Sequence, residues 1–542
     1  MAPREELLVI LDLTSTVLRA GVGVTDLIRG PLLELPTRIG RKRSPSLTSS
    51  TPQVEDYLVG HYLSQAETTT TGKSEGDGDG FEIVFPLIMD PKLGFTVTDW
   101  VGLEAILRYA LHTSLQLPRP PLAHPTVISV PPGLPHSTID KLHQLLFEKL
   151  LLPSILLSCR PFFAAGASGI NSGLVLDVGW RGEGSEISVV HENRVLESFG
   201  SKSEKLSWID EGVLDDYLAV KLWESNDKND LLEGFKKALG KEEIGMGECL
   251  DGVRRIVGEL KSRDLIGFES KHFEAKDMNM VQTQGGEEDG SFNVAKAVVE
   301  GKVSEIVKKK STTKTKSSSN SKTPEGDYVT IPNPFSPPPP PPPVDLTQPV
   351  PEIPEHANLS IGPCRHSYLE PLFFPQVLKT HLTTKNESAK QLGLTYFENL
   401  EVPHSGIQES LGNVLCSIGD REIREQVSEN LVVISSGRVA SNKALGNTLI
   451  PLLSPYVQSP IPLTDTYSET GGPSYNKLAM KFAKCPEYFS NFKKHGGDWS
   501  VYLGGCIMGK LLIGDQQSKL FMSKADYAQK GPAYYRQLDL IA

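Results

Sequence analysis

The sequence predicts an α/β protein built of two similar halves, because two hairpin patterns lie far apart in the chain. In the first, the apolar runs Leu7–Leu11 and Val17–Val24 flank the polar turn Asp12–Thr16. In the second, the apolar runs Gly173–Val178 and Ile187–Val190 flank a glycine-rich turn. Short apolar runs separated by polar turns are typical of β-hairpins. The recurrence of strand, aspartate, turn and strand indicates that the two halves are related.

Other segments predict the strands and helices that connect these hairpins. Pro125–Val130 is apolar and ends at a proline pair, so it is expected to form a strand. The helix after it is expected to begin with Ser137 as N-cap and with Asp140 closing a capping box. Leu431–Ile434 is a third apolar run, which predicts a strand before a helix or turn over Leu449–Leu453.

Composition limits the classes of protein to consider. Of the 542 residues, 39% are hydrophobic and 22% are charged, which is enough to bury a core and excludes a wholly disordered chain. The formal net charge of -11 argues against an extended surface that binds nucleic acid. The cysteines lack C-x-x-C spacing, so a reduced intracellular compartment is expected, without a disulfide framework or zinc site. No apolar run is long enough to cross a bilayer, so no membrane partner is expected.

Two segments differ from the rest of the chain in composition. Residues 271–357 carry lysine, serine and proline tracts that bury too little apolar area to offset the entropy of ordering. They predict a disordered or extended insertion. A smaller polar insertion is expected near residues 67–80. In the larger one, Lys308–Lys310 is either a nuclear import signal or a solvated linker, and Pro337–Pro343 is either a stiff spacer or a ligand for an aromatic groove.

Several blocks of sequence resemble actin and its relatives, in the order that this family has them. The blocks are Val97–Trp100, Glu370–Pro375, Asn430–Gly437, Asp498–Gly505 and Met522–Tyr527. With shorter matches between them, they cover nearly the whole chain outside the two insertions. The resemblance implies an α/β, actin-like fold, in which two ribonuclease-H-like domains, each with a five-stranded mixed sheet, enclose a nucleotide cleft.

The resemblance also divides the chain into domains. Residues 1–167 are expected to form the N-terminal part of an outer actin-like domain, which contains the insertion near 67–80. Residues 168–489 are expected to form the inner domain, interrupted by the insertion 271–357. Residues 490–542 are expected to return to the outer domain.

An actin-type cleft holds ATP between turns whose backbone N–H groups approach the phosphates closely. By the resemblance, the positions retained from such a site are Asp12, Ser15, Arg19, Asp177, Gly179 and Gly437. The positions that depart from the family are Thr14, Thr16, Arg160, Trp180, Glu186, Val257 and Gly258. The site is therefore interpreted as a vestige.

The departures in the two turns remove specific chemical functions. Thr14 and Thr16 replace glycines and crowd the phosphate, because residues with a Cβ atom restrict positive φ. Trp180 replaces an aspartate that orders metal-bound water. Arg160 stands at the position of a glutamine that polarises the attacking water, and a guanidinium cannot accept a proton.

Further departures lie toward the nucleoside. Glu186 takes a histidine position, and Val257 with Gly258 replaces a Lys-Glu pair that contacts ribose and adenine. Together the departures predict a pseudo-ATPase: not an enzyme, with no catalytic residue, no metal and no required cofactor. Weak ATP or ADP binding through the retained aspartates and arginine stays compatible with the sequence. A further hypothesis is that Arg160 and Arg438 place positive charge where a phosphate would lie.

Within the family, Leu33–Ile39 and Lys477–Lys494 most resemble the fungal actin-related protein nine group of SWI/SNF and RSC chromatin-remodelling complexes. The resemblance implies a nuclear, non-catalytic subunit that regulates remodelling and transcription. Its expected partners are a second actin-related protein, the helicase-SANT-associated helix of the remodeller ATPase and, indirectly, chromatin. The helix is expected to enter an apolar groove near Gly166–Ile170 and Tyr502–Leu512.

Two alternatives stay open at the level of sequence. The segment Gly169–Gly179 also resembles the actin-related subunit at the pointed end of dynactin, which would make the protein cytoplasmic. The second alternative is an active ATPase of the actin and Hsp70 type.

Overall fold

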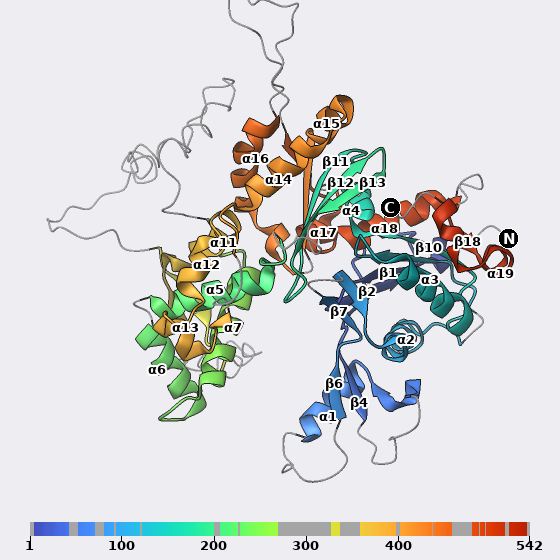
Figure 1. The fold of residues 1–542 in the computed structure, drawn as a ribbon. Coiled ribbons are helices and arrows are strands. Elements are labelled where there is room, and N and C mark those ends of the chain that lie inside the picture. The colour runs from blue at the N-terminus through green and yellow to red at the C-terminus, as the bar shows by residue number, and fades with distance from the viewer. Residues whose placement is uncertain are drawn as a thin grey trace, which may run out of the picture.

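The chain forms four groups of elements, two built on large sheets and two that extend from them (Figure 1). The computed structural model describes residues 5–42, 52–70, 81–90, 94–119, 122–199, 206–225, 228–268, 327–336, 358–396, 402–435, 437–457, 480–486, 488–493, 495–514 and 520–538. Most of the expected insertion 271–357 lies outside these residues, as do Lys308–Lys310, Pro337–Pro343 and residues 71–80.

The first large sheet has six strands in the order β18-β10-β9-β1-β2-β3. Its strands are β1 (Val9–Leu13), β2 (Val17–Val22), β3 (Leu33–Pro36), β9 (Thr126–Val130), β10 (Ser154–Cys159) and β18 (Met522–Ser523). Strand β1 is buried along its whole length, which its sequence Val-Ile-Leu-Asp-Leu permits at every position except Asp12. It pairs parallel with β9 and antiparallel with β2, so the first expected hairpin is confirmed. The sheet has one strand more than expected, because β18 brings a C-terminal segment back beside β10.

Helices cover both faces of this sheet. They are α2 (Trp100–Arg108), α3 (His136–Gln144), α4 (Arg160–Ser168), α18 (Ser500–Gly514) and α19 (Lys524–Lys530). Helix α18 packs closely on α4 because Gly504 has no Cβ, which would overlap the carbonyl oxygen of Phe163. The predicted cap of α3 was wrong: Pro135 is the N-cap, and no side chain caps the helix. The fixed φ of Pro135 starts the helix before Ser137.

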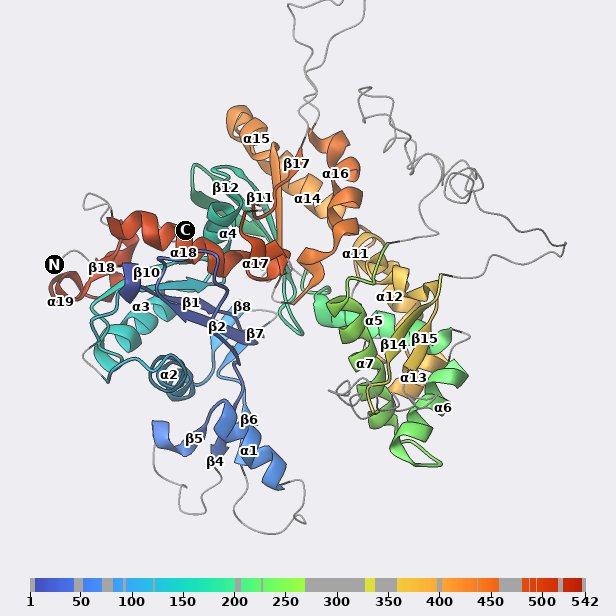
Figure 2. The same ribbon diagram turned by 180° about the vertical axis from the view of Figure 1, so that it is seen from behind.

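The second large sheet has five strands in the order β13-β12-β11-β16-β17. Its strands are β11 (Gly173–Val178), β12 (Ser185–His191), β13 (Arg194–Phe199), β16 (Asn430–Ser435) and β17 (Lys481–Phe482). Strand β11 pairs antiparallel with β12 and parallel with β16, which confirms the second expected hairpin. Helices α14 (Ile407–Ser417), α15 (Arg421–Val427), α16 (Lys443–Val457) and α17 (Ser490–Lys493) lie around it (Figure 2).

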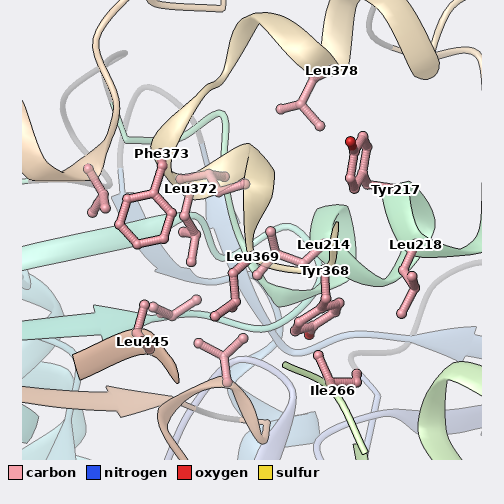
Figure 3. Packing of buried hydrophobic residues seen from close by; sticks show 14 of the residues in the cluster. Leu214, Tyr217, Leu218, Ile266, Tyr368, Leu369, Leu372, Phe373, Leu378 and Leu445 are labelled. Atoms are coloured by element: carbon pink, nitrogen blue, oxygen red, sulfur yellow. The ribbon is translucent and has the colours of Figure 1, made fainter. Parts of the chain in front are cut away.

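A helical group extends from this second sheet. It contains α5 (Glu211–Glu224), α6 (Lys228–Leu239), α7 (Met246–Ser262), α11 (Glu370–Phe373), α12 (Gln376–His381), α13 (Glu387–Leu392) and the antiparallel pair β14 (Val329–Pro332) and β15 (Asn358–Ile361). Its core is continuous with that of the sheet. In that core Leu214 of α5 lies near Leu369 and Tyr368, and Tyr217 of α5 lies beside Leu378, as Figure 3 shows. This packing fixes the start of α5, which carries residues of the site below.

The fourth group is smaller and extends from the first sheet (Figure 1). It contains α1 (His61–Thr70), a three-stranded sheet of β4 (Ile39–Lys42), β5 (Tyr57–Leu58) and β6 (Phe81–Val84), and the pair β7 (Leu87–Asp90) and β8 (Gly94–Val97). Across the described ranges, no helix combines the length and the apolar character needed to span a membrane.

Candidate functional site

The two hairpin turns meet through one carboxylate. Glu183, in the turn between β11 and β12, reaches the turn between β1 and β2. Its Oε1 accepts hydrogen bonds from the backbone N of Ser15 at 3.1 Å, from Ser15 Oγ at 2.6 Å and from Thr16 Oγ1 at 3.3 Å. Its Oε2 accepts from the backbone N of Trp180 at 2.6 Å. Backbone N–H and hydroxyl groups that converge in a turn form an anion site, and here the chain's own anion occupies it.

Arg160 joins the aspartates of the two hairpins. It opens α4 directly after β10, where its guanidinium lies between the ends of β1 and β11. Its Nη1 lies 2.8 Å from Oδ1 of Asp12, and its Nε lies 2.7 Å from Oδ2 of Asp177. Only 2% of the Arg160 side chain is exposed. Burial alone would lower the pKa of Arg160, but the charges of Asp177 and Asp12 raise it above its ordinary value.

Both carboxylate oxygens of Asp12 have partners in the protein. Besides Arg160, Oδ1 accepts a hydrogen bond from Ser129 Oγ at 2.5 Å. Oδ2 lies 3.5 Å from Nη1 of Arg19, which also pairs through Nε with Glu34 at 2.9 Å. Asp12 therefore serves as the anchor of a buried ion cluster.

A cavity of about 30 Å³ adjoins this cluster. Its walls include Thr14, Arg160, Asp177, Gly179, Glu183 and Glu186. Among the side chains that the structure describes, Nη2 of Arg160 and Oδ1 of Asp177 are buried without a hydrogen-bond partner. A space of this size with a donor and an acceptor on its wall fits one or two water molecules.

A second internal carboxylate occupies a third loop. Glu211, at the start of α5, is completely buried. Its oxygens accept hydrogen bonds from the backbone N of Arg438 at 2.8 Å and of Val439 at 3.3 Å. Lys261 of α7 pairs with it at 2.9 Å. Gly437 makes this approach feasible, because a Cβ atom at that position would overlap the Glu211 carboxylate.

A larger cavity of about 540 Å³ lies between the two halves. Its walls include Thr16, Arg19, Glu34, Trp180, Arg181, Glu211, Asp215, Arg254, Gly258, Lys261, Gly437, Arg438, His495, Asp498 and Trp499. Nζ of Lys261 lies 4.9 Å from the centre of the Trp180 ring, which is a cation–π distance. On the opposite half, the Trp499 ring stacks on His495 at 3.5 Å and donates to Glu34.

Burial and neighbouring charges shift the pKa values of several groups around this cavity. Asp498 accepts a hydrogen bond from Ser435 Oγ at 3.0 Å, yet burial and the nearby charge of Glu211 raise its pKa well above the usual range. Burial also raises the pKa of Asp210, the N-cap of α5, to about 6. Lys261 has a raised pKa, because the charges of Glu211 and Asp215 outweigh the opposing effect of burial.

Most of the residues selected from the sequence do come together. Around the small cavity and the ion cluster lie Asp12, Thr14, Ser15, Arg19, Arg160, Asp177, Gly179 and Glu186. Thr16, Trp180, Gly258, Gly437 and Arg438 line the larger cavity. Val257 is separate, because it is buried in the core that α7 shares with the second sheet.

The sequence patterns did not identify four acidic residues at the cleft, which are Glu183, Asp210, Glu211 and Asp498. Glu183 lies within the extra residues of the second turn, and an acidic residue between two glycines was a signal available there. Asp210 and Glu211 precede an apolar helix, a pattern that indicates an N-cap and first turn but not a contact with a distant loop. Asp498 was part of a family block, and its burial beside Glu211 depends on tertiary packing alone.

The arrangement does not fit a magnesium–nucleotide complex. The donors of the first turn are already bonded to Glu183, and Asp12 is bonded on both oxygens. A guanidinium lies between the two aspartates, where it repels a metal ion. In the part of the chain with described side chains, no group of three or more His, Cys, Asp or Glu residues is placed to hold a metal.

The chain shares sequence with known proteins. Residues 4–206 match the sequence profile of the family described as Actin. Actin-like protein 7B of Homo sapiens is 26% identical over 282 residues, which is 50% of this chain and 60% of that protein. Actin-related protein 4 of Arabidopsis thaliana is 29% identical over 110 residues, 20% of this chain and 24% of that protein. Actin-related protein 4 of Oryza sativa subsp. indica is 28% identical over 161 residues, 30% of this chain and 34% of that protein.

These matches agree with the architecture. The match to the Actin family is confined to residues 4–206, and the fold of the described residues is actin-like, with two mixed sheets whose hairpin turns meet at a cleft. Actin-related and actin-like proteins are its distant relatives. The alignments span between 24% and 60% of the length of these relatives.

Proposed function

We propose that the protein is a non-catalytic actin-related subunit in which its own side chains occupy the phosphate-facing turns and the space between the two aspartates. The observation that carries this proposal is Arg160, which pairs with both Asp12 and Asp177 while almost fully buried. Hydrolysis of ATP by an actin-type site requires those carboxylates for metal-bound water and a group that accepts a proton. Arg160 blocks the first and cannot supply the second.

The scaffold would then act by presenting surface to partners. Helices α4 and α18 pack together along one face, with Gly166 against Met508. Leu511 on α18 is 63% exposed, although Ile507 and Leu512 beside it pack on the core. We place the docking surface for an amphipathic partner helix at Leu511 on this helix pair, in the helix-in-groove mode of recognition.

The partners that we propose are those implied by the resemblance of Leu33–Ile39 and Lys477–Lys494. They are a second actin-related protein and the helicase-SANT-associated helix of a SWI/SNF- or RSC-type remodeller ATPase. The function would be to regulate remodelling and transcription in the nucleus, with chromatin as an indirect partner. Two of the relatives are named actin-related protein 4, which supports the actin-related part of this proposal.

Affinity purification of the tagged full chain, followed by mass spectrometry, tests the assignment. Recovery of a remodeller ATPase with another actin-related protein is the expected result. Recovery of dynactin subunits without any remodeller would reject it and support the alternative.

A second measurement tests the loss of catalysis. Purified protein is expected to show no ATP turnover above a buffer blank and no thermal stabilisation by magnesium-ATP, since a ligand stabilises only the state that it binds. Turnover that is lost in Asp177→Ala would instead establish an active ATPase.

A further inference from the structure

The environment of Glu183 is that of a bound anion rather than of a surface acid. Four donors from two separate turns converge on its carboxylate: Ser15 N, Ser15 Oγ, Thr16 Oγ1 and Trp180 N. Only 8% of the residue is exposed. No lysine or arginine is among these donors, so the contact is an amide and hydroxyl cradle of the kind that binds oxyanions.

The turn that carries Glu183 holds the carboxylate in place. The backbone N of Glu183 donates to the carbonyl oxygen of Trp180 at 2.8 Å, and Gly179 N donates to Gly184 O at 2.9 Å. Glu211 N donates to Gly179 O at 2.9 Å, which ties the turn to α5. The carboxylate is thus presented to the first turn by a closed, hydrogen-bonded loop.

Glu211 repeats the same relationship at the third loop. Its carboxylate accepts from two consecutive backbone N–H groups, those of Arg438 and Val439. Two loops at this cleft therefore have their donors satisfied by carboxylates from elsewhere in the chain. This repetition argues against a chance contact at Glu183.

We propose that Glu183 is an internal ligand, whose carboxylate occupies an oxyanion site formed jointly by the two hairpin turns. Removing that carboxylate opens the site to a small oxyanion from solution, and the adjoining cavity of about 30 Å³ adds room for it. In the native protein the internal ligand holds the two halves together without any bound nucleotide. This inference rests on the proposed loss of ATPase function, because an external phosphate cannot occupy the same donors.

The test uses the full chain carrying Glu183→Ala, probed with formate and with inorganic phosphate against chloride at equal ionic strength. Formate supplies the deleted carboxylate group without the rest of the glutamate side chain. We expect formate or phosphate to raise the thermal midpoint of Glu183→Ala in a saturable way and to bind it at least about tenfold more tightly than the wild type.

Two control variants distinguish anion binding at the Glu183 site from non-specific effects of anions on stability. Glu183→Gln keeps the space filled, so it is expected to be destabilised and to show no response to either anion. Glu82→Ala removes an exposed carboxylate paired with Arg41, and it is expected to behave like the wild type. If Glu183→Ala does not fold in chloride, its soluble refolding yield is measured with and without formate, and a higher yield with formate supports the proposal.

Equal anion responses in wild type, Glu183→Ala and Glu82→Ala would overturn the inference, as would a refolding yield that formate does not change. The proposed function is judged separately, by ATP turnover and co-purifying proteins of the wild type. If the wild type shows no ATP turnover and the Glu183→Ala variant does not respond to either anion, this inference is rejected and the proposed function is not.

Discussion

Nε of Arg160 lies 2.7 Å from Oδ2 of Asp177, and the same guanidinium reaches Asp12 at 2.8 Å. The strands that carry these aspartates belong to different sheets, so the two halves of the molecule share one buried cation. Ion pairs of this kind depend on complete pairing, because a single unpaired charge in the interior is costly.

The first prediction concerns this cation. Arg160→Leu is expected to lower the free energy of unfolding by about 3–5 kcal/mol, since it leaves Asp177 without its cation and Asp12 with only the more distant Arg19. Urea denaturation followed by circular dichroism measures the change. The triple variant Arg160→Leu, Asp12→Asn, Asp177→Asn is expected to recover much of the loss, because the uncompensated charges are gone.

A matched control for this variant is Arg41→Ala, which breaks the exposed pair with Glu82. This variant is expected to lower the free energy of unfolding by about 0–1 kcal/mol, which is the usual contribution of an exposed ion pair. A cost at Arg160 no larger than that at Arg41 would contradict the description of a shared buried cation.

The second prediction compares two glycines at the larger cavity. Gly437→Ala is expected to destabilise the protein by about 1–3 kcal/mol, because the added Cβ displaces the Glu211 carboxylate from the backbone N–H groups of the third loop. Gly258→Ala, within α7 and with open space around its Cβ position, is expected to stabilise by about 0.5–1 kcal/mol. Thermal unfolding of both variants checks the opposite signs, and destabilisation of similar size in both would reject the argument.

The third prediction concerns the pH dependence of stability at Asp498. Its pKa in the folded state lies well above the ordinary value of 3.8, so the folded protein holds this proton more tightly than the unfolded chain. The stability that the group contributes is therefore present below about pH 4 and lost as the pH rises through the folded pKa. Arg19 and Arg438 oppose the shift, but burial and Glu211 outweigh them.

Asp498→Asn removes this titration. The variant is expected to be more stable than the wild type at pH 8, because it does not have to keep a proton on, or a charge in, a buried carboxyl group at that pH. The difference is expected to shrink toward pH 4. Urea midpoints across this range measure it, and a variant less stable than the wild type at pH 8 would refute the expectation. Asp210, whose pKa is raised to about 6, stays in both proteins, so only the difference between them is informative.

Local sequence patterns were sufficient to predict the two hairpins around which the fold is built. The apolar runs on either side of Asp12 and Asp177 predict the two hairpins, because strand and turn chemistry are local properties. The same kind of local pattern placed the start of α3 incorrectly, because Pro135 and not Ser137 is its N-cap.

The chemistry of the site could be predicted only in part. Arg160 was recognised as a group that cannot polarise water, but its pairing with both aspartates requires the distance between two sheets. The hypothesis that Arg160 and Arg438 supply charge at a phosphate position did not foresee carboxylates at the loops. Glu183 and Glu211 bond to residues 168 and 227 positions away in the chain, so no local pattern reports their contacts.

The last prediction addresses the proposed partner surface. Leu511→Glu places a charge on the exposed face of α18 without disturbing its buried side, so the fold is expected to be unchanged. When the chain is co-expressed with the helicase-SANT-associated helix of a SWI/SNF-type ATPase, the variant is expected to bind at least about tenfold more weakly, since a buried charge without a partner opposes helix docking. Met246→Glu is the matched control, because Met246 is 57% exposed on α7, in a different group of elements. Calorimetry on the purified pairs measures both affinities, and equal losses for the two variants would place the docking surface away from α18.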